Sequence, residues 1–426
     1  MERNDPRYQA YVEILKEELI PAMGCTEPIA LAYAAAKARE VLGVLPDSVQ
    51  LQVSGSIIKN VKSVIVPNTG HLKGMEAAVA AGIIAGSAEK ELEVISEVSE
   101  DKKAAIRDYL QTVPISIQHI EQGHVFDIIV TERSGDSYAK VRIADFHTNI
   151  CLIEKNGRVL YEKPLLNEEA RRDSRVDRSL LNMQDIWDFA ETADLRDVAD
   201  LLERQIRYNN AIAEEGLLGD YGANIGQVLL STYGNDVSIR AKAKAAAGSD
   251  ARMNGCELPV IINSGSGNQG ITCSVPLIEY AKELHSGKEK LYRALIISNL
   301  VAIHEKTGIG TLSAYCGAVS AGAGAGAGIV YLCGDGYQAA IHTVVNALAI
   351  VSGIVCDGAK ASCAAKIASS VDAALLGYNM YKCNQEFKGG DGIVMKDIET
   401  TIKGIGRLGK DGMRQTNEEI IRLMMS

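Results

Sequence analysis

The chain has 426 residues, of which 47 % are hydrophobic and 23 % are charged, and its net charge is −10. This composition is typical of a globular protein with a sizeable apolar core. The length predicts about two or three domains. No run of lysine and arginine stands out, so the electrostatic signature of a nucleic-acid-binding protein is missing.

Neither the N-terminus nor the longest uncharged run predicts a membrane protein. The first twenty residues carry charges throughout and lack the apolar stretch of a signal peptide. The longest uncharged run, residues 307–334, is long enough to span a bilayer, but glycine, alanine and serine dominate it. We therefore expect a closely packed interior helix there, and a cytoplasmic protein without a membrane segment.

The first half of the chain alternates between helical and strand-like patterns. Apolar spacing predicts helices at 7–19, 28–42, 74–85 and 101–110. Runs rich in β-branched residues predict strands at 49–53, 61–66, 115–120, 126–131, 138–143, 148–154 and 159–162. Hairpin signals such as Asn156-Gly157 separate the later strands, which favours an antiparallel meander.

The pattern changes at a charged stretch, residues 168–179, which we interpret as a linker or capping region. Helical spacing follows at 183–193, 195–214, 238–249, 276–283 and 288–305, and an Ala/Gly-rich helical block continues to about residue 376. We therefore predict an α+β protein. A mixed N-terminal domain with an antiparallel sheet (residues 1–175) precedes a mainly helical domain (residues 176–426).

Nine cysteines in a chain without an export signal are expected to remain thiols, so the question is which of them bind metal. Cys316 precedes the Ala/Gly run, and Cys356 and Cys363 follow it. Thiolates are soft ligands that suit iron–sulfur clusters and zinc. Cys356 and Cys363 share a face if one helix carries both, whereas Gly358 equally allows a loop or a helix start.

A structural zinc site needs a fourth ligand and usually a tighter pair of cysteines, and the sequence has neither. Three cysteines without an obvious fourth suit a cluster with one open iron. The spacing also fits three small buried hydrophobic residues, since free cysteine is among the most buried residue types. At this point both interpretations stay open.

Two glycine-rich segments differ in what they can bind. Residues 263–270, NSGSGNQG, follow the apolar run 258–262, and their unhindered N–H groups can bind a carboxylate or phosphate at a helix N-terminus. A plain turn is the alternative. Residues 321–328 alternate Ala and Gly but lack the preceding strand and the later acidic residue of a dinucleotide-binding site.

Two polar loops of the N-terminal domain carry candidate acid–base groups. The segment GCTEP, residues 24–28, lies between two predicted helices. A helix N-terminus can lower the pKa of Cys25 and make it a base or nucleophile, although Thr26 is an equally good N-cap. In the loop 67–74, His71 titrates near neutral pH and is a second candidate, unless it is an ordinary surface residue.

Taken together, GCTEP, MNGCELPVIINSGSGNQGI and SAYCGAVSAGAGAG followed by CDGAKASC resemble the L-cysteine desulfidase family, which is also grouped as serine-dehydratase-like. The likeness runs through nearly the whole chain with collinear motifs. Residues from about 245 to 380 are more distantly similar to the α region of the iron–sulfur L-serine dehydratases. In those enzymes a Gly/Ser loop binds the substrate carboxylate and three cysteines hold a 4Fe–4S cluster.

The resemblance implies a role for each matching residue. Cys316 and Cys356 match the first two cluster cysteines, and Cys363 is the third, although it lies closer to Cys356 than the dehydratase pattern has it. The chain ends without the C-terminal cysteine that can close the dehydratase cluster, so Cys25 is either a fourth ligand at rest or the base, with His71 second for the base. The implied substrate-binding residues are Thr26, Glu27, Asn263, Ser264, Gly265, Ser266, Gly267 and Asn268.

The implied activity is that of a carbon–sulfur lyase, with a small amino acid as substrate. An open iron polarises the leaving group, a base removes the Cα proton, and L-cysteine yields pyruvate, ammonia and sulfide. An L-serine or L-threonine dehydratase using the same site is the nearest alternative. A pyridoxal phosphate enzyme using Lys360 or Lys366, a non-catalytic Fe–S carrier or redox sensor, and an inactive zinc protein are others. The resemblance also implies a homodimer.

Overall fold

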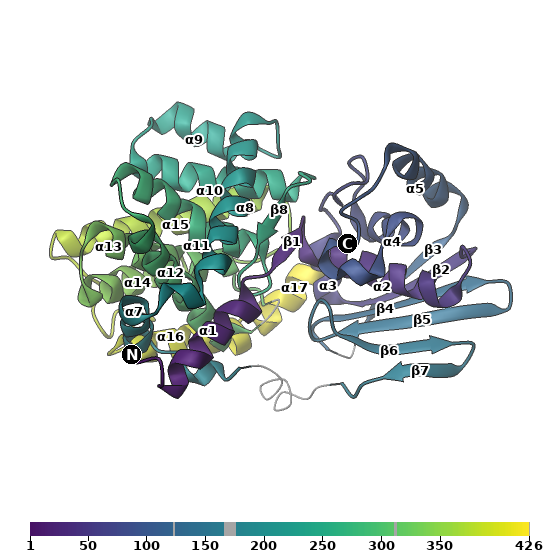
Figure 1. Ribbon diagram of the computed structural model, residues 1–426, viewed down its shortest axis with the longest axis horizontal. Helices are drawn as coiled ribbons and strands as arrows, with labels where there is room; N and C mark the ends of the chain where they lie inside the picture. The colour runs from purple at the N-terminus through teal and green to yellow at the C-terminus, as the bar shows by residue number, and fades with distance from the viewer. Residues whose placement is uncertain (122–123, 166–175, 311–312, 426) are drawn as a thin grey trace.

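The computed structural model describes residues 1–121, 124–165, 176–310 and 313–425. Figure 1 shows two lobes side by side, one built around a β-sheet and the other almost entirely helical. The predicted α+β class is confirmed. The predicted domain boundary between residues 175 and 176, and most of the predicted linker, fall on residues outside these ranges, so the boundary stays a prediction.

The sheet lobe contains a six-stranded mixed sheet in the order β3-β2-β4-β5-β6-β7. Strand β2 pairs in parallel with β3 and antiparallel with β4, and the remaining neighbours are antiparallel. The predicted meander is therefore confirmed for β4 to β7. The strands are β2 (Ser48–Ser54), β3 (Ile115–Ile120), β4 (Asp127–Ser134), β5 (Ser137–Ala144), β6 (Ile150–Lys155) and β7 (Arg158–Glu162).

Helices of the same lobe cover one face of this sheet (Figure 1). They are α2 (Thr26–Leu42), α3 (Gly55–Val61), α4 (Gly74–Ala85), the short η1 (Ala88–Glu93) and α5 (Glu100–Thr112). Helix α2 packs directly on β4 and β5, and α4 packs on α2. Helices α2, α4 and α5 match predicted helices, whereas α3 and η1 were not predicted.

The strand predicted at 61–66 is wrong. Helix α3 ends at Val61, and the following residues form a loop whose only pairing is an isolated bridge from Ile65 to Lys73. Val64 and Val66 are buried in that loop. Both edges of the neighbouring strand β2 are already occupied by β3 and β4, so the β-branched residues are buried without entering the sheet.

The helical lobe surrounds one central helix, α13, which packs against α11, α12, α14 and α15. Its members are α1 (Pro6–Glu18), η2 (Arg178–Leu180), α7 (Met183–Thr192), η3 (Leu195–Asp197), α8 (Ala199–Leu218), α9 (Ile225–Tyr233), α10 (Val237–Met253), α11 (Gly267–Glu283), α12 (Lys288–Ile309), α13 (Gly317–Cys333), α14 (Tyr337–Val351), α15 (Ser362–Lys382), α16 (Ile398–Arg407) and η4 (Leu408–Gly412). Two short strands, β1 (Pro21–Met23) and β8 (Pro259–Ile261), pair antiparallel at the side facing the sheet lobe.

The Ala/Gly run forms the buried helix that the sequence predicts. A Cβ atom on Gly324 would lie 2.5 Å from the backbone oxygen of Ser298 on α12, and one on Gly322 would lie 2.8 Å from the backbone of Ser370 on α15. Glycine at these positions lets three helix backbones approach closely. In the part of the chain that the structure describes, no helix is both long and apolar enough to cross a membrane.

Each end of the chain packs away from the segment next to it in the sequence. The first helix lies in the helical lobe although the sheet lobe follows it, and the last helix lies on the sheet lobe although it follows the helical lobe. Helix α1 packs in the helical lobe, where Tyr8 and Tyr11 meet the ring of Phe189 edge to face at centroid distances of 5.1 and 5.4 Å. The last helix, α17 (Arg414–Met425), packs on α3 of the sheet lobe. Of the two contacts, the one between α17 and α3 ties the lobes together at their junction.

The contact between α2 and α4 supplies a test of this packing. A Cβ on Gly82 of α4 would lie 2.2 Å from the backbone oxygen of Ala32 on α2. Gly82→Ala is therefore expected to lower the free energy of unfolding by about 1–3 kcal/mol, measured by chemical denaturation. In the matched control, Gly404→Ala within α16, the atom nearest to the added Cβ lies 3.7 Å away. Because alanine has a higher helix propensity than glycine, this substitution should raise the free energy of unfolding by up to about 1 kcal/mol. Stabilisation by both substitutions would contradict the close α2–α4 contact.

Candidate active site

Two motifs that the sequence analysis singled out meet at the junction of the lobes. The segment 24–28 links β1 to α2, and the Gly/Ser segment links β8 to α11. The hydroxyl of Thr26 donates a hydrogen bond to the carbonyl of Gly265 at 3.1 Å, although the two residues are 239 positions apart. This contact brings the start of α2 next to the start of α11.

The Gly/Ser segment is a tight turn followed directly by a helix. The backbone N–H groups of Asn263 and Ser266 each donate to the other residue's carbonyl, and Ser264 and Gly265 take left-handed conformations with φ of 49° and 76°. Helix α11 begins at Gly267, nine residues before the predicted start, and no side chain caps its first turn. The backbone N–H groups at a helix start have no intrahelical partner, so they are available where the sequence predicts that an anion binds, and the binding itself stays a prediction.

The predicted residues of this segment do different things. The side chain of Asn263 is fully buried and donates to the Asn299 side-chain oxygen at 2.9 Å, so it holds the turn in place. Ser264 donates to the Asn263 side chain at 2.9 Å. The side-chain oxygen of Asn268 accepts a hydrogen bond from Arg252 at 3.1 Å. Ser266 is the N-cap residue of α11 without a side-chain cap bond.

Arg252 adds a positive charge at this helix start, and the sequence analysis missed it. Its side chain comes from α10 and is 2 % exposed. The Nε atom has no hydrogen-bond partner among the described residues. A Cβ on Gly267 would lie 2.2 Å from Nε, so glycine is required for the guanidinium to lie against α11. An arginine in the Ala-rich stretch of α10 was the available signal.

Cys25 is the N-cap residue of α2, but its electrostatics differ from the expectation. Its Sγ donates a hydrogen bond to Glu27 Oε2 at 3.0 Å, and the side chain is buried. Burial and the negative charge of Glu27 raise the pKa of Cys25 well above its ordinary value. The lowered pKa predicted from the helix N-terminus is therefore wrong, because desolvation and a neighbouring carboxylate outweigh the helix dipole. Thr26 is the first residue of α2 rather than its cap.

Glu27 is a buried carboxylate held by hydrogen-bond donors from two elements, the start of α2 and α3. Besides Cys25, the Asn60 side-chain amide on α3 donates to Oε1 at 3.0 Å, and the Thr26 hydroxyl, whose hydrogen also faces Gly265, lies 3.2 Å from Oε2. His147 Nε2 lies 3.8 Å from Oε1, which is an ion-pair distance and too long for a hydrogen bond. Burial alone would raise the pKa of Glu27, but His147 and the Cys25 thiol lower it to about 2.

His147 is a second residue that the sequence analysis missed. It lies between β5 and β6, where its ring meets Phe126 edge to face at 4.7 Å. Its Cε1 atom would lie 3.5 Å from a Cβ on Gly265, so a side chain of the sheet lobe covers the Gly/Ser turn of the helical lobe. No local pattern distinguishes it from the other six histidines of the chain.

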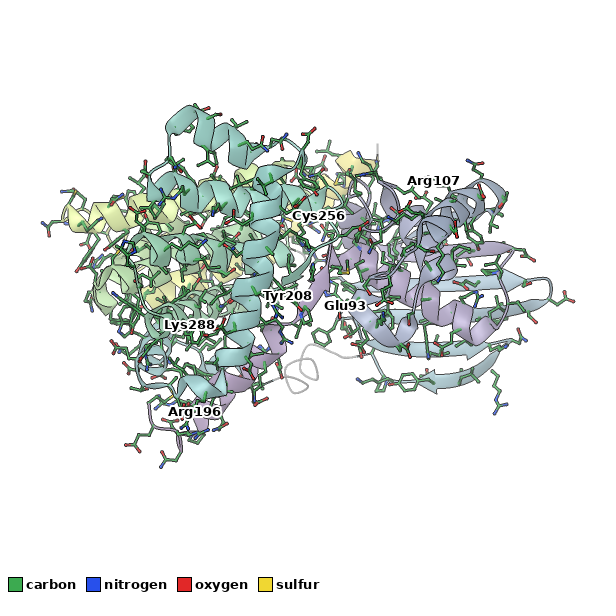
Figure 2. The ribbon with its side chains drawn as sticks, turned by 45° about the horizontal axis from the view of Figure 1, so that its top comes forward. Glu93, Arg107, Arg196, Tyr208, Cys256 and Lys288 are labelled. Atoms are coloured by element: carbon green, nitrogen blue, oxygen red, sulfur yellow. The ribbon has the colours of Figure 1, made fainter. Side chains whose placement is uncertain are left out.

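His71 lies elsewhere on the junction. Its side chain is exposed and its Nδ1 would lie 3.7 Å from a Cβ on Gly255, next to Cys256, which Figure 2 labels between the lobes. Within the described residues no hydrogen bond or ion pair joins His71 to Cys25, Glu27 or the Gly/Ser turn. Its predicted acid–base role stays a prediction.

The three predicted metal-binding cysteines come from neighbouring segments. Cys316 is the N-cap residue of α13, Cys356 lies in the segment between α14 and α15, and Cys363 lies in the first turn of α15. The Cys316 N–H donates to Ile354 O at 3.2 Å and the Cys356 N–H donates to Ala314 O at 2.6 Å. Cys356 therefore precedes α15, so the loop alternative at Gly358 is correct and the continuous helix is not.

The thiols influence one another and are partly or fully buried. Burial, and then the charge of Cys356, raises the pKa of Cys316 to about 12. Burial raises the pKa of Cys363 as well, with a contribution from Cys356. All nine cysteines lie in described residues, and no two of them form a disulfide.

Two lysines face these thiols. Lys59 of α3 is 1 % exposed, and burial lowers its pKa against the opposing charges of Cys356 and Glu27. Burial also lowers the pKa of Lys306 to about 8, and Cys356 and Cys316 oppose that shift. The two cations therefore offset charge that three thiolates would bring into this region. Lys360 and Lys366 pair with Asp357, and their charges also act to lower the pKa of Cys363 against the effect of burial.

The thiols adjoin the Gly/Ser segment through the first turns of two helices. A Cβ on Gly317, the residue after Cys316, would lie 2.6 Å from the side chain of Gln269 in the first turn of α11. The Oε1 atom of Gln269 is buried and has no hydrogen-bond partner among the described residues. The N-termini of α11 and α13 are therefore adjacent, and both favour negative charge.

The donor set fits some metal groups and not others. In the described part of the chain, no three histidine, cysteine, aspartate or glutamate side chains are arranged to hold a metal ion. An iron–sulfur cluster makes a different demand, because each thiolate ligand binds its own iron atom. Three thiols of one region, with two lysines nearby, match that donor chemistry.

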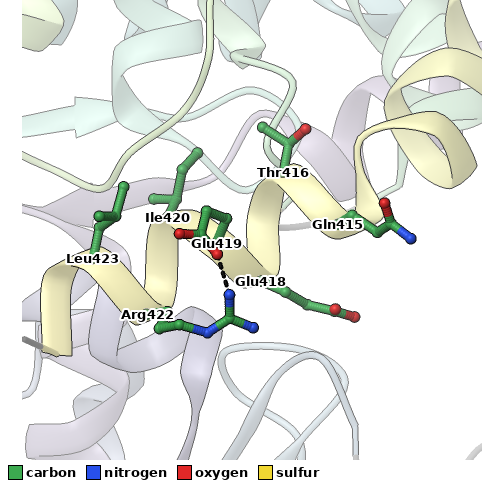
Figure 3. Close-up of a pocket in the computed structure, with 7 residues that line it drawn as sticks. All are labelled: Gln415, Thr416, Glu418, Glu419, Ile420, Arg422 and Leu423. Carbon is green, nitrogen blue, oxygen red and sulfur yellow. Dashed lines mark hydrogen bonds and ion pairs between the residues drawn. The ribbon is translucent and has the colours of Figure 1, made fainter.

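Helix α17 closes the junction from the other side. Asn417 accepts a hydrogen bond from the Lys59 ammonium at 2.6 Å, and Ile421, one helical turn later, contacts Gly55 of α3. The pocket in Figure 3 is lined by the other positions of this helix, Gln415, Thr416, Glu418, Glu419, Ile420, Arg422 and Leu423. That pocket contains none of the candidate site residues. Helix α17 instead contacts α3 through Asn417 and Ile421.

The carboxylate of Glu27 supplies a test of this geometry. Since the pKa of Glu27 in the folded protein, about 2, is below its ordinary value of 4.5, the ionised group stabilises the fold by about 3 kcal/mol at neutral pH. This contribution is present above about pH 4.5 and is lost as the pH falls toward 2. The difference in unfolding free energy between the wild type and Glu27→Gln should therefore shrink below about pH 4.5, measured by urea denaturation. A difference that stays constant to about pH 3 would contradict the lowered pKa.

Comparisons with known proteins identify the family of the chain. Residues 89–422 match the family model described as serine dehydratase alpha chain. A UPF0597 protein of Desulfitobacterium hafniense (strain Y51) is 62 % identical over 426 residues, covering 100 % of this chain and 99 % of that protein. A UPF0597 protein of Lachnoclostridium phytofermentans is 53 % identical over 419 residues, covering 98 % and 100 %. One of Oleidesulfovibrio alaskensis is 38 % identical over 426 residues, covering 99 % of each. The chain therefore belongs to the serine dehydratase alpha-chain family and, within it, to the UPF0597 proteins.

Proposed function

We propose that this chain is a lyase that removes the β-substituent of a small L-amino acid, with L-cysteine as the preferred substrate. The observation that supports this best is one juxtaposition. The Gly/Ser turn at the start of α11 contacts the GCTEP segment through Thr26 and Gly265. The first turn of α11 also abuts α13 beside Cys316. An anion-binding helix start, an acid–base cluster and three thiols therefore adjoin one another.

The substrate carboxylate is expected to bind at the start of α11. The N–H groups of Gly267 and Asn268 have no intrahelical partner there, and the buried guanidinium of Arg252 lies against the same turn. Asn263 and Ser264 hold the turn in its left-handed conformation. Binding at this position places the Cα atom between the Gly/Ser turn and the side chains that surround Glu27.

We assign the 4Fe–4S ligands to Cys316, Cys356 and Cys363. When bound, such a cluster supplies an open iron that polarises the leaving substituent of the substrate. Around it, Lys59 and Lys306 offset the negative charge of the thiolates and of the departing sulfide. Burial of Cys316 and Lys59 keeps bulk water away from this region.

The reaction balances without an external oxidant or reductant. The Cα–H and Cβ–S bonds break, a carbon–carbon double bond forms, and sulfur leaves with the bonding electron pair and takes up a proton. The resulting enamine tautomerises to an imine, and one water molecule converts the imine to pyruvate and ammonia. L-Serine would lose water in place of hydrogen sulfide, which is the reaction that the matched family model's description names. We favour L-cysteine because a thiolate leaving group suits a soft metal better than hydroxide.

The test is an anaerobic preparation of the full chain, assayed for bound iron and sulfide and for turnover of L-cysteine and L-serine. Cys316→Ser and Cys356→Ser are expected to lose bound iron and to lose at least about 100-fold in sulfide release. The matched control is Cys333→Ser, since Cys333 is a free, exposed cysteine at the far end of α13. This control should keep both iron and turnover.

Each outcome separates one alternative. Faster pyruvate release from L-serine than from L-cysteine would favour the dehydratase. Bound iron without turnover of L-cysteine, L-serine or L-threonine would favour a cluster carrier or redox sensor. A colourless, zinc-containing and inactive protein prepared without oxygen would overturn the proposal.

A further inference from the structure

The group that removes the substrate Cα proton has to be unprotonated and has to face the Gly/Ser turn. The Cys25 thiol fails the first condition, because it donates a hydrogen bond to Glu27 and its pKa is raised well above the ordinary value. His71 is exposed and lies beside Gly255 rather than beside the turn. Another base is therefore required, and the residues around Glu27 supply one.

We infer that His147 is the proton-transfer residue of this site, with Glu27 as the positioning residue that orients its ring. This inference rests on the proposed elimination reaction. The supporting observation is the position of the imidazole. It lies between the buried carboxylate of Glu27 and the Gly/Ser turn, where the substrate carboxylate is expected to bind.

On the first side, His147 Nε2 points toward Glu27. The two atoms Nε2 and Oε1 lie 3.8 Å apart, and Nε2 is buried without a hydrogen-bond partner among the described residues. A buried, unpartnered ring nitrogen next to an ionised carboxylate is costly unless the contact shortens when the site is occupied. Catalytic hydrogen bonds are often long in the free enzyme and tighten when substrate binds.

On the second side, the ring covers the turn that holds the substrate carboxylate. A Cβ on Gly265 would lie 3.5 Å from Cε1 and 4.0 Å from Nδ1 of His147. If Nε2 carries the hydrogen directed at Glu27, the lone pair is on Nδ1, the nitrogen next to the turn. Phe126 fixes the ring plane from behind through its edge-to-face contact at 4.7 Å.

Glu27 is suited to stabilise the charge that this step creates. Its carboxylate is ionised, with a pKa of about 2. It is held in place by Asn60, Thr26 and the Cys25 thiol. In the step, a bond forms from Nδ1 to the proton and the Cα–H bond breaks, which leaves its electron pair on Cα beside the bound carboxylate. That pair then enters the new carbon–carbon double bond as the Cβ–S bond releases its pair to sulfur. The imidazolium then faces a fixed negative charge, which is the arrangement of a base with an orienting carboxylate.

The test isolates proton removal from elimination by using L-alanine, which has a Cα proton and no leaving group. Wild-type protein with its iron intact should exchange the Cα hydrogen of L-alanine for deuterium in D₂O, followed by NMR. His147→Gln should lose at least about 100-fold in exchange rate and in kcat for L-cysteine, with a small change in KM. Added imidazole should restore part of the exchange in His147→Ala.

Matched variants separate His147 from its neighbours. His285→Asn changes an exposed histidine between α11 and α12 and should leave exchange unchanged. Glu27→Gln should lower kcat by less than His147→Gln does, because the base itself is retained. Cys25→Ser keeps a donor toward Glu27 and should keep measurable exchange. Iron content and thermal unfolding are measured for each variant, so a loss of cluster or fold is recognised separately.

The outcomes distinguish the two proposals. If the wild type releases sulfide but His147→Gln exchanges L-alanine and turns over L-cysteine as well as the wild type does, the assignment of His147 is overturned and the lyase proposal stands. Loss of exchange in Cys25→Ser with full exchange in His147→Gln would assign the base to Cys25. A wild-type protein that neither exchanges the Cα hydrogen of L-alanine nor eliminates the β-substituent of L-cysteine, L-serine or L-threonine would overturn both proposals.

Discussion

The junction of the two lobes depends on the buried carboxylate of Glu27. An ionised carboxylate removed from water is tolerated only where donors surround it. Here the donors come from its own helix, from Asn60 on α3 and, at longer distance, from His147 between β5 and β6. The Thr26 hydroxyl lies within hydrogen-bond distance of both Glu27 and the Gly265 carbonyl of the helical lobe. These polar contacts therefore hold together the GCTEP segment, the loop between β5 and β6, and the Gly/Ser turn.

The second constraint is the close approach of helices around α13. Its glycines allow α12 and α15 to contact its backbone, and this packing brings the start of α13 beside the start of α11. Two helix N-termini in one place favour negative charge, and Lys59 and Lys306 add to the effect. Three thiols placed in this environment are positioned to become thiolates when they bind a cationic group, since that group and the lysines then offset their charge.

The two chain ends complete the arrangement. Helix α1 packs against the helical lobe before the chain enters β1 and the GCTEP segment. Helix α17 returns from the helical lobe to α3, where Asn417 accepts from the buried ammonium of Lys59. The geometry around Lys59 therefore depends on residues more than 350 positions apart in the sequence. A change in the last helix would reach the site through this single lysine.

Much of the secondary structure could be predicted from the sequence, because apolar spacing reports local burial directly. The helix at residues 74–85 and the strand at 115–120 match the structure residue for residue. The prediction of a strand at 61–66 was wrong, because β-branched residues indicate burial and not sheet pairing as such. Both edges of β2 are occupied by β3 and β4. The helices at 225–233, 398–407 and 414–425 were missed.

For the site, the sequence by itself determined which segments carry chemistry: the GCTEP segment, the Gly/Ser loop and the three cysteines. Their residue types limit what they can bind, whatever the fold. Only the tertiary structure decided how Cys25 titrates, since its local helix dipole and its buried surroundings act in opposite directions. It also decided that Arg252, Lys59 and His147 belong to the site. Each of these comes from a different element, and no short-range pattern records which side chains distant elements bring together.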